Sequence, residues 1–339
     1  MTIASDYNFI KNIKIPLPSE LAKELPITSL ERTKILQARH DIANILSGND
    51  KRMLIVVGPC SVHHPEPILQ YAIELNKLRI KYEKRLFIVM RCYVEKSRTG
   101  NAWSGFALDP DINASFDCYK GIYESRKLMK EISMMGIPIG MEFVFPNISR
   151  YFLDFLSWGC IGARSVEAPD LRFFASGVSM PIGVKNSTSG NIEVAFSAMQ
   201  VISNPQLCYL GNNVGITSGN TAVHLIYRGS HHNKQGFSLK KIVSFVDRQN
   251  RYGFQTKTMI DCSHGNAFAS GGQDMALKLL INNMSVLRKH ISGIMFESFI
   301  ENGHTSFSLC NAKRACSITD SCLGIEETKY LLSQIYNVL

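Results

Sequence analysis

The stretch LIVVGPCSVHH, residues 54–64, places four apolar residues directly before Gly-Pro-Cys-Ser. A short apolar run that ends on Gly58 and Pro59 predicts a buried strand followed by a turn. Taken alone, the stretch leaves Cys60 as an ordinary core residue, because free cysteine is commonly buried. Its meaning depends on whether the same pattern recurs along the chain.

The pattern occurs eight times along the chain, with a predicted helix after each predicted strand. The strands cover residues 54–58, 86–91, 138–143, 160–164, 181–185, 223–228, 257–261 and 293–298. The helices cover residues 65–82, 119–136, 148–159, 169–177, 191–203, 238–253, 274–291 and 326–339. Continuous apolar strands separated by helices are typical of a covered parallel sheet, and eight units favour a closed (β/α)8 TIM barrel. An open doubly wound sheet is the alternative, which is weakened because no G-x-G-x-x-G follows the first strand.

Two segments lie outside this repeat. Residues 1–48 form a predicted N-terminal extension to a barrel of residues 49–339. Within the extension, Thr28 and Glu31 predict a capping box at the start of a helix, and Gly48 can close its end. The second segment, near residues 206–217, lies between the fifth helix and the sixth strand. We expect it to form an inserted β-hairpin.

Composition limits the class of protein. The 339 residues are 45% hydrophobic, enough for a sizeable core. No apolar run approaches the roughly 18 residues of a membrane helix, and the polar start MTIASDYNFIKNIK lacks the features of a signal peptide. Nine scattered cysteines without a CxxC pair indicate a reduced, cytoplasmic protein. The net charge of +9 is dispersed rather than clustered in runs, which favours small anions over nucleic acid as ligands.

Each predicted strand ends at or near a reactive or charged residue. In a barrel of this kind the carboxyl ends of the strands form one rim, where chemistry takes place. Cations are numerous in this set, and so many positive charges on one rim are tolerable only if anions bind between them. We therefore expect a ligand with one or more phosphate groups. The cations are Arg91, Arg164, Lys185 and Arg228, with Lys96 and Arg98 in the loop after the second strand.

The remaining rim residues offer different chemistry. A mixed set of sulfur, nitrogen and oxygen donors suits a divalent ion such as Mn²⁺, Fe²⁺, Co²⁺ or Zn²⁺. The alternative is that Cys60 belongs to the core and His264 caps a turn. Glu142, a carboxylate among cations, is either a counter-ion or a group that takes a proton from water. The candidate metal donors are Cys60, His264, Glu297 and Asp320.

Seven motifs resemble, in order, those of the 3-deoxy-D-arabino-heptulosonate 7-phosphate (DAHP) synthase family, in its type I form with an N-terminal extension. They are GPCSVHHP, MRCYVEKSRT, SWGCIGARSVE, PIGVKNSTSG, DCSHGN, MFES and SITDSCLG. The resemblance extends from about Thr28 to the end of the chain. It implies a (β/α)8 barrel that condenses phosphoenolpyruvate with erythrose 4-phosphate and releases phosphate, in the first step of the shikimate pathway.

The resemblance also implies roles for individual residues. The metal-ligand positions fall on Cys60, His264, Glu297 and Asp320. The phosphoenolpyruvate positions fall on Arg91, Lys96, Arg164, Lys185 and Arg228. Arg98 and Thr99 fall in the loop that holds the aldose phosphate. The residues expected to take part in the chemistry are Lys96, Glu142, Lys185 and His264.

Three alternatives to this function remain open at the level of the sequence. They are a related phosphoenolpyruvate-condensing synthase that uses arabinose 5-phosphate, a non-catalytic barrel that binds phosphometabolites, and a nucleic-acid-binding protein. The KSRT loop, the extension and the complete set of metal donors count against the first two. The absence of basic runs counts against the third. The family forms dimers and tetramers through its extension and hairpin, so a homodimer or homotetramer is expected.

The chain departs from the family pattern at several positions. Ser97 replaces the proline of the usual Lys-Pro-Arg-Thr loop, and Ser104 replaces a common lysine after Trp103. These changes leave the identity of the aldose open. The hairpin looks shorter than in feedback-regulated relatives, and Phe145 and Arg150 replace their usual residues, although Ser179 is retained. We therefore expect weak or absent inhibition by Phe or Tyr.

Overall fold

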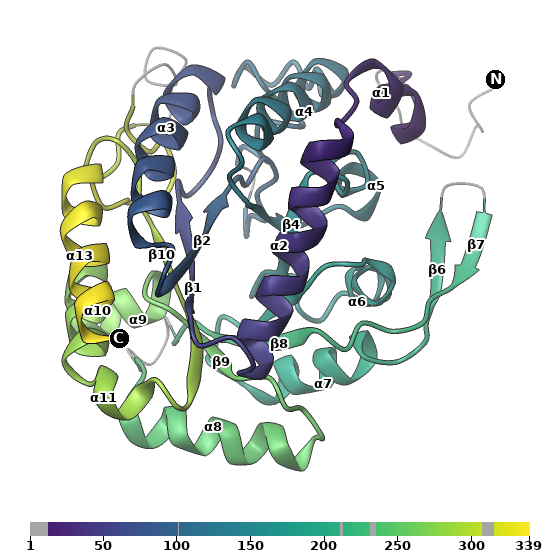
Figure 1. The fold of residues 1–339 in the computed structure, drawn as a ribbon. Coiled ribbons are helices and arrows are strands. Elements are labelled where there is room, and N and C mark those ends of the chain that lie inside the picture. Colours follow the sequence, from purple (N-terminus) through teal and green to yellow (C-terminus); the bar gives the residue numbers. More distant parts are fainter. Residues whose placement is uncertain (1–12, 101, 211–212, 231–234, 307–314) are drawn as a thin grey trace.

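Eight parallel strands close into a barrel in the computed structural model, which describes residues 13–100, 102–210, 213–230, 235–306 and 315–339 (Figure 1). Around the barrel the order is β1-β10-β9-β8-β5-β4-β3-β2. The strands are β1 (Met53–Gly58), β2 (Leu86–Arg91), β3 (Ile139–Phe143), β4 (Leu156–Ile161), β5 (Ile182–Lys185), β8 (Val223–Tyr227), β9 (Thr258–Asp261) and β10 (Ile291–Glu297). This closed sheet confirms the predicted (β/α)8 architecture and excludes the open sheet.

Helices cover the outside of the barrel (Figure 1). They are α3 (Pro65–Tyr82), α4 (Cys118–Met134), α5 (Pro146–Ser149), α6 (Pro169–Gly177), α7 (Glu193–Ile202), α8 (Leu239–Arg251), α9 (His264–Ser270), α10 (Gln273–Asn282), α11 (Met284–Leu287) and α13 (Ile325–Val338). In the part of the chain that the structure describes, every helix is too short or too polar to cross a bilayer. The eight cysteines among these residues are all free thiols.

The strands are apolar throughout because both of their faces are buried. In β1, Leu54 and Val56 belong to a cluster inside the barrel, whereas Ile55 and Val57 belong to the larger core between the sheet and its helices. A strand buried on both faces has no position that favours a polar side chain. This arrangement explains the unbroken LIVV run, which a half-exposed strand would have interrupted.

The N-terminal extension supplies α1 (Pro18–Glu24) and α2 (Ser29–Ser47), and α2 joins the interior of the barrel. Its residues Ile42, Ile45 and Leu46 are buried in the same cluster as the inward-facing residues of β1 and β10. The predicted capping box begins α2: the Thr28 Oγ1 accepts from the Glu31 N–H at 3.2 Å, and the Thr28 N–H donates to the Glu31 carboxylate. Residues 1–12 of the predicted extension lie outside the described residues.

A two-stranded antiparallel hairpin projects from the side of the barrel between α7 and β8 (Figure 1). It consists of β6 (Leu207–Leu210) and β7 (Asn213–Ile216), and the residues at its turn, 211–212, lie outside the described part of the chain. Leu17 and Pro18 at the start of α1 line a cavity of about 990 Å³ together with Gly215 and Ile216 of β7. The extension and the hairpin are thus close neighbours in the fold.

The fourth unit differs from its predicted boundaries. The helix predicted over 148–159 is only the short α5, and the strand predicted over 160–164 begins earlier, as β4 (Leu156–Ile161). All six residues of β4 are buried, and Trp158 points into the cluster inside the barrel. Pairing with β3 and β5 outweighs the local helical spacing of Phe152, Phe155 and Leu156. As a result, Arg164 lies three residues beyond its strand.

The predicted helix 274–291 also proves to be two helices, because the chain bends at Asn283. This residue lies between α10 and α11 with φ −110°, outside the helical range. The last residue of the predicted helix, Ile291, instead begins β10. A further short helix, α9, starts at His264, between the predicted strand over 257–261 and the predicted helix over 274–291.

Candidate active site at the mouth of the barrel

The predicted rim residues gather at the carboxyl ends of the strands. Arg91, Lys185 and Glu297 are the last residues of β2, β5 and β10, and Glu142 lies within β3. The others follow their strands by one to three residues: Arg228 after β8, Cys60 after β1, and Arg164 and His264 after β4 and β9. Residues distant in sequence thus share one opening because parallel strands all end on the same face.

Two glycines allow this rim to close tightly. Gly58 has φ +151°, and a Cβ there would lie 2.9 Å from the Arg91 carbonyl oxygen, so only glycine fits between β1 and β2. A Cβ on Gly162, just after β4, would collide with the Glu142 carboxylate. These positions explain the glycines of GPCSV and CIGAR: each leaves room for a side chain or backbone that the site needs.

Three of the four predicted metal donors come together. The ligand atoms of Cys60, Glu297 and Asp320 all lie within 4.8 Å of one another. The Cys60 thiol donates to the Asp320 carboxylate at 3.5 Å. A thiolate with two carboxylates is a donor set that borderline divalent ions accept. The residues present therefore fit a metal ion, as the sequence predicted.

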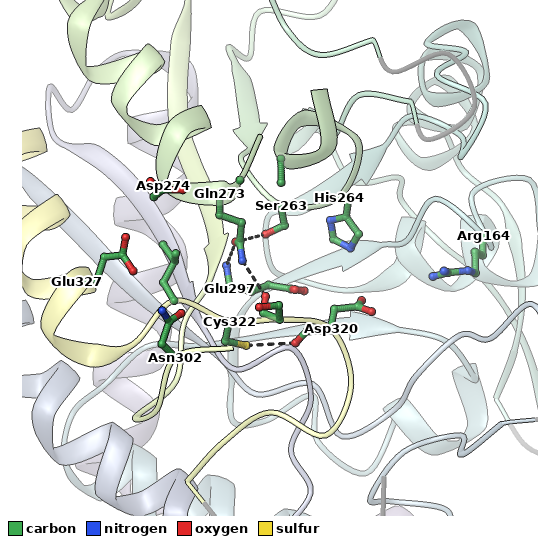
Figure 2. A pocket seen from close by; sticks show the side chains of 14 residues that line it. Arg164, Ser263, His264, Gln273, Asp274, Glu297, Asn302, Asp320, Cys322 and Glu327 are labelled. Carbon is green, nitrogen blue, oxygen red and sulfur yellow. Dashed lines mark hydrogen bonds between the residues drawn. The ribbon is translucent and has the colours of Figure 1, made fainter. Parts of the chain in front are cut away.

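His264, the fourth predicted donor, is not part of this group within the described residues. Its Nδ1 pairs instead with Asp261 Oδ2 at 3.0 Å. His264 still lines the same cavity of about 680 Å³ as Glu297 and Asp320, and Figure 2 shows its imidazole directed toward them. A histidine whose Nδ1 is held by a carboxylate has its Nε2 left for a ligand, the arrangement common at metal sites.

Lys96 lies against the metal donors. Its ammonium donates to the Cys60 carbonyl at 2.8 Å and to the Cys60 sulfur at 3.2 Å. Burial alone would lower the pKa of Lys96, but nearby Cys60, Glu297 and Glu142 outweigh that effect and raise it. Burial and the Glu297 charge raise the pKa of the Cys60 thiol to about 11, against the smaller opposing effect of Lys96. When no metal is bound at neutral pH, Lys96 is therefore a protonated ammonium group that can donate a proton, and the neighbouring Cys60 thiol is also protonated.

Two buried guanidinium groups at the carboxyl ends of the strands have unused donors. Arg91 is 1% exposed, pairs with Glu297 at 2.8 Å and stacks over the Tyr93 ring. Its Nη1, like the Nη1 of the buried Arg228, has no hydrogen-bond partner among the described residues. Burial lowers the pKa of Arg228. Unsatisfied buried donors on cations are costly, so they indicate a place where an anion binds.

Lys185 and Glu142 form part of a chain of buried charges. The Lys185 ammonium lies 3.0 Å from Asp261 Oδ2 and 4.0 Å from Glu142 Oε2. Burial would raise the pKa of Glu142, yet Lys185, Lys96 and Arg91 hold it below its usual value. Glu142 is therefore ionised at neutral pH. It also accepts a hydrogen bond from Ser97 at 3.4 Å.

Asp261 is a site residue that the sequence reasoning missed. It is fully buried and contacts both Lys185 and His264. Burial would raise its pKa, but Lys185 and His264 lower it well below the usual value. The signal was available, since Asp261 ends a predicted strand and is the first residue of the DCSHGN motif. Because the residues before it in TMID are mostly apolar, the sequence pattern predicts only that Asp261 ends a strand.

The loop after β2 and the loop after β4 share a second opening. Arg98, Thr99 and Arg164 line a cavity of about 420 Å³ together with serine and threonine hydroxyls of residues 187–189. Arg164 is exposed, and its Nε donates to the Thr99 hydroxyl at 3.0 Å. Two guanidinium groups and several hydroxyls around one open cavity suit a phosphate group.

These features define a class: a barrel enzyme with a candidate metal centre beside sites for anionic groups. Residues 25–333 match the model of the DAHP synthetase I family, and the chain belongs to that family. This match confirms the resemblance carried by the seven motifs.

Individual relatives agree with the family match over nearly the whole chain. The chain is 37% identical to a Trp-sensitive phospho-2-dehydro-3-deoxyheptonate aldolase of Buchnera aphidicola, covering 95% of this chain and 94% of that one. It is 34% identical to the Tyr-sensitive enzyme of Escherichia coli, covering 95% and 92%. The solved phospho-2-dehydro-3-deoxyheptonate aldolase of Francisella tularensis superposes with a TM-score of 0.93 at 33% identity, covering 98% of each chain.

Proposed function

We propose that the barrel mouth condenses phosphoenolpyruvate with erythrose 4-phosphate and water to give DAHP and inorganic phosphate, the first step of the shikimate pathway. One observation carries the proposal beyond family membership: the Cys60, Glu297 and Asp320 donors lie on the same rim as buried guanidinium groups with free N–H donors. The reaction joins two anions at a carbonyl carbon, and it needs both features together.

Phosphoenolpyruvate binds, in this proposal, to the cations Arg91, Lys96, Arg164, Lys185 and Arg228. The free Nη1 atoms of Arg91 and Arg228 support this assignment, because a phosphate or carboxylate oxygen would satisfy them. Erythrose 4-phosphate places its phosphate near Arg98 and Thr99, in the smaller cavity. The cations overcome the mutual repulsion of the two substrates and hold them in a reactive orientation.

Cys60, Glu297 and Asp320 would hold the metal ion, with His264 as a fourth ligand. Such an ion would supply Lewis-acid polarisation of the aldehyde carbonyl of the aldose. Mn²⁺, Fe²⁺, Co²⁺ and Zn²⁺ all suit one sulfur, one nitrogen and two oxygen donors. The Nδ1 contact between His264 and Asp261 supports the assignment, because it fixes the orientation of the imidazole.

The side chains move the protons. The enol carbon of phosphoenolpyruvate attacks the aldehyde carbon, and Lys96 donates a proton to the developing alkoxide. Positive charge develops at C2 of the former phosphoenolpyruvate. Glu142, ionised and supported by Lys185, orients the water that adds there and accepts its proton. The hemiketal phosphate then expels phosphate, which leaves the ketone.

The extension and the hairpin are proposed to hold copies of the chain together in a homodimer or homotetramer, and to form any regulatory site. Exposed apolar side chains on the hairpin support the assembly: Tyr209, Val214 and Ile216 are each more than half exposed. The free thiols of the described residues support a reduced, cytoplasmic setting. Phosphoenolpyruvate and the sugar phosphate are the expected ligands, and no nucleic-acid or membrane partner is expected.

The test measures phosphate release from phosphoenolpyruvate with erythrose 4-phosphate, in parallel with arabinose 5-phosphate. We expect phosphate release with erythrose 4-phosphate as the second substrate but not with arabinose 5-phosphate. A chelator should abolish this activity, and Mn²⁺ should restore it. Activity only with arabinose 5-phosphate would move the protein to a different synthase. Full activity in chelator would exclude a metal ion from the mechanism. Unchanged turnover in a Lys96→Met variant would exclude Lys96 as the proton donor.

A further inference from the structure

Gln273 occupies an unusual position beside the candidate metal centre. It is the first residue of α10 and lines the same cavity as His264, Glu297 and Asp320 (Figure 2). The two preceding glycines make the turn from α9 to α10: Gly271 has φ +88° and Gly272 has φ +150°. Both values favour glycine over other residues. The short Gly-Gly turn therefore places the amide side chain of Gln273 at the rim.

The amide of Gln273 connects three separate segments of the chain. Its Oε1 accepts from the Ser263 hydroxyl at 2.6 Å and from the Glu297 backbone N–H at 2.8 Å. Its Nε2 donates to the Ser321 carbonyl at 2.9 Å. A primary amide can do this because one oxygen has two lone pairs and the nitrogen has two protons. Figure 2 shows these contacts radiating from one side chain.

Each contacted residue stands next to, or is itself, a proposed metal ligand. Ser263 immediately precedes His264, the second bond holds the backbone of Glu297 itself, and Ser321 immediately follows Asp320. The remaining ligand segment is tied in separately, because the hydroxyls of Ser61 and Thr319 lie 2.9 Å apart. Side chains on three separate segments need such a link if their donor atoms are to stay within a few ångströms of one another.

We infer that Gln273 is a positioning residue of the metal centre: it ties together the segments that carry His264, Glu297 and Asp320, and it is not itself a ligand. The inference rests on the proposed function, since it assumes that these residues bind a metal ion. Losing an outer partner of this kind typically weakens metal affinity by about 10–100-fold. Gln273→Met keeps the length of the side chain and removes all three hydrogen bonds.

Gln249 provides a matched control at the opposite end of β9. Its amide donates to the Thr256 carbonyl at 2.7 Å and accepts from the Thr258 hydroxyl at 2.8 Å, and it is buried. Gln249→Met removes a comparable amide link without touching the rim. Ser263→Ala is a milder test, because it removes one of the three bonds and leaves the link from Glu297 to Ser321 in place.

The experiment titrates Co²⁺ into the apo forms of the whole protein and follows the sulfur-to-cobalt charge-transfer absorption, with thermal unfolding measured in parallel. We expect the Co²⁺ Kd to rise about 10–100-fold in Gln273→Met and about fivefold in Ser263→Ala, the cost of one hydrogen bond. Gln249→Met should lower the thermal midpoint while changing the Kd less than about twofold. At saturating Co²⁺, the KM of Gln273→Met for phosphoenolpyruvate should equal the wild-type value.

Two results would overturn the inference in different ways. A normal Co²⁺ Kd in Gln273→Met, with only the thermal midpoint lowered, would reduce Gln273 to a structural residue while the metal centre stands. Absence of the charge-transfer band in the wild type, or its persistence in Cys60→Ser, would refute the metal centre of the proposed function and the inference with it.

Discussion

Metal binding at Cys60 should release a proton, and its affinity should rise with pH. Burial raises the pKa of the Cys60 thiol to about 11, and the Glu297 charge contributes to the increase. Below that pH the metal-free protein holds the proton, whereas a metal ligand must be a thiolate. Each ion that binds therefore displaces one proton from Cys60. The sign follows: lower pH favours the protonated, metal-free form, and higher pH favours the metal-bound form.

The size of the effect follows from the same pKa. One displaced proton makes the Kd fall tenfold per pH unit, so we expect about a 30-fold gain in affinity between about pH 7 and about pH 8.5. At pH 7.5 the proton costs roughly 5 kcal/mol of binding free energy, at 1.36 kcal/mol per pH unit. Structural sites for Zn²⁺ reach about 10–16 kcal/mol, so net binding remains favourable.

The assay titrates Co²⁺ into the apo protein at several pH values, and calorimetry in two buffers of different ionisation enthalpy counts the protons released. Cys60→Asp is the matched variant, because a carboxylate is already ionised in this window. We expect a slope near one and one released proton for the wild type, and a slope near zero for Cys60→Asp. A flat wild-type profile, or an equally steep profile in Cys60→Asp, would contradict the assignment of Cys60 as a ligand.

Three further predictions concern stability, substrate binding and regulation. Leu46→Ala should lower the free energy of unfolding, measured in urea, by about 3 kcal/mol, because the Leu46 side chain of α2 is fully buried in the cluster inside the barrel. A loss under about 1 kcal/mol would mean that α2 is not part of the core. Arg98→Ala should raise the KM for erythrose 4-phosphate about 10–100-fold, because it removes one hydrogen bond to a charged group. The KM for phosphoenolpyruvate, measured in the same steady-state kinetics, should stay unchanged. Phe or Tyr at millimolar concentration should leave activity nearly unchanged, because Arg150, one of the predicted departures from feedback-regulated relatives, lines the cavity beside α1. Strong inhibition by either amino acid would show that this cavity works as a regulatory pocket.

The repeat of apolar strands and helices is a local property, and it could be read without a structure. Strands such as β1 are apolar on both faces because they lie between two cores, so their signal is strong. The Thr28–Glu31 capping box depends on residues three positions apart, and it too was predictable. The long ordered motifs identified the family and placed most of the rim residues at the ends of their strands.

Contacts between segments remote in sequence were not predictable in this way. The boundaries of β4 were misplaced because pairing with β3 and β5 outweighs helical spacing. The partners of Asp261 and Gln273 depend on how neighbouring strands and loops are placed around the closed barrel.

The sequence by itself determined that this chain forms a (β/α)8 barrel with cations and candidate metal donors near one rim, because the alternation of apolar strands and amphipathic helices is a local property of a polypeptide. Only the tertiary structure decided which of these side chains meet. Closing the barrel brings Cys60 within reach of Asp320 and sets Arg91 against Glu297. It also leaves His264 held by Asp261. Those distances are fixed by strand register and loop packing, which no short stretch of residues encodes.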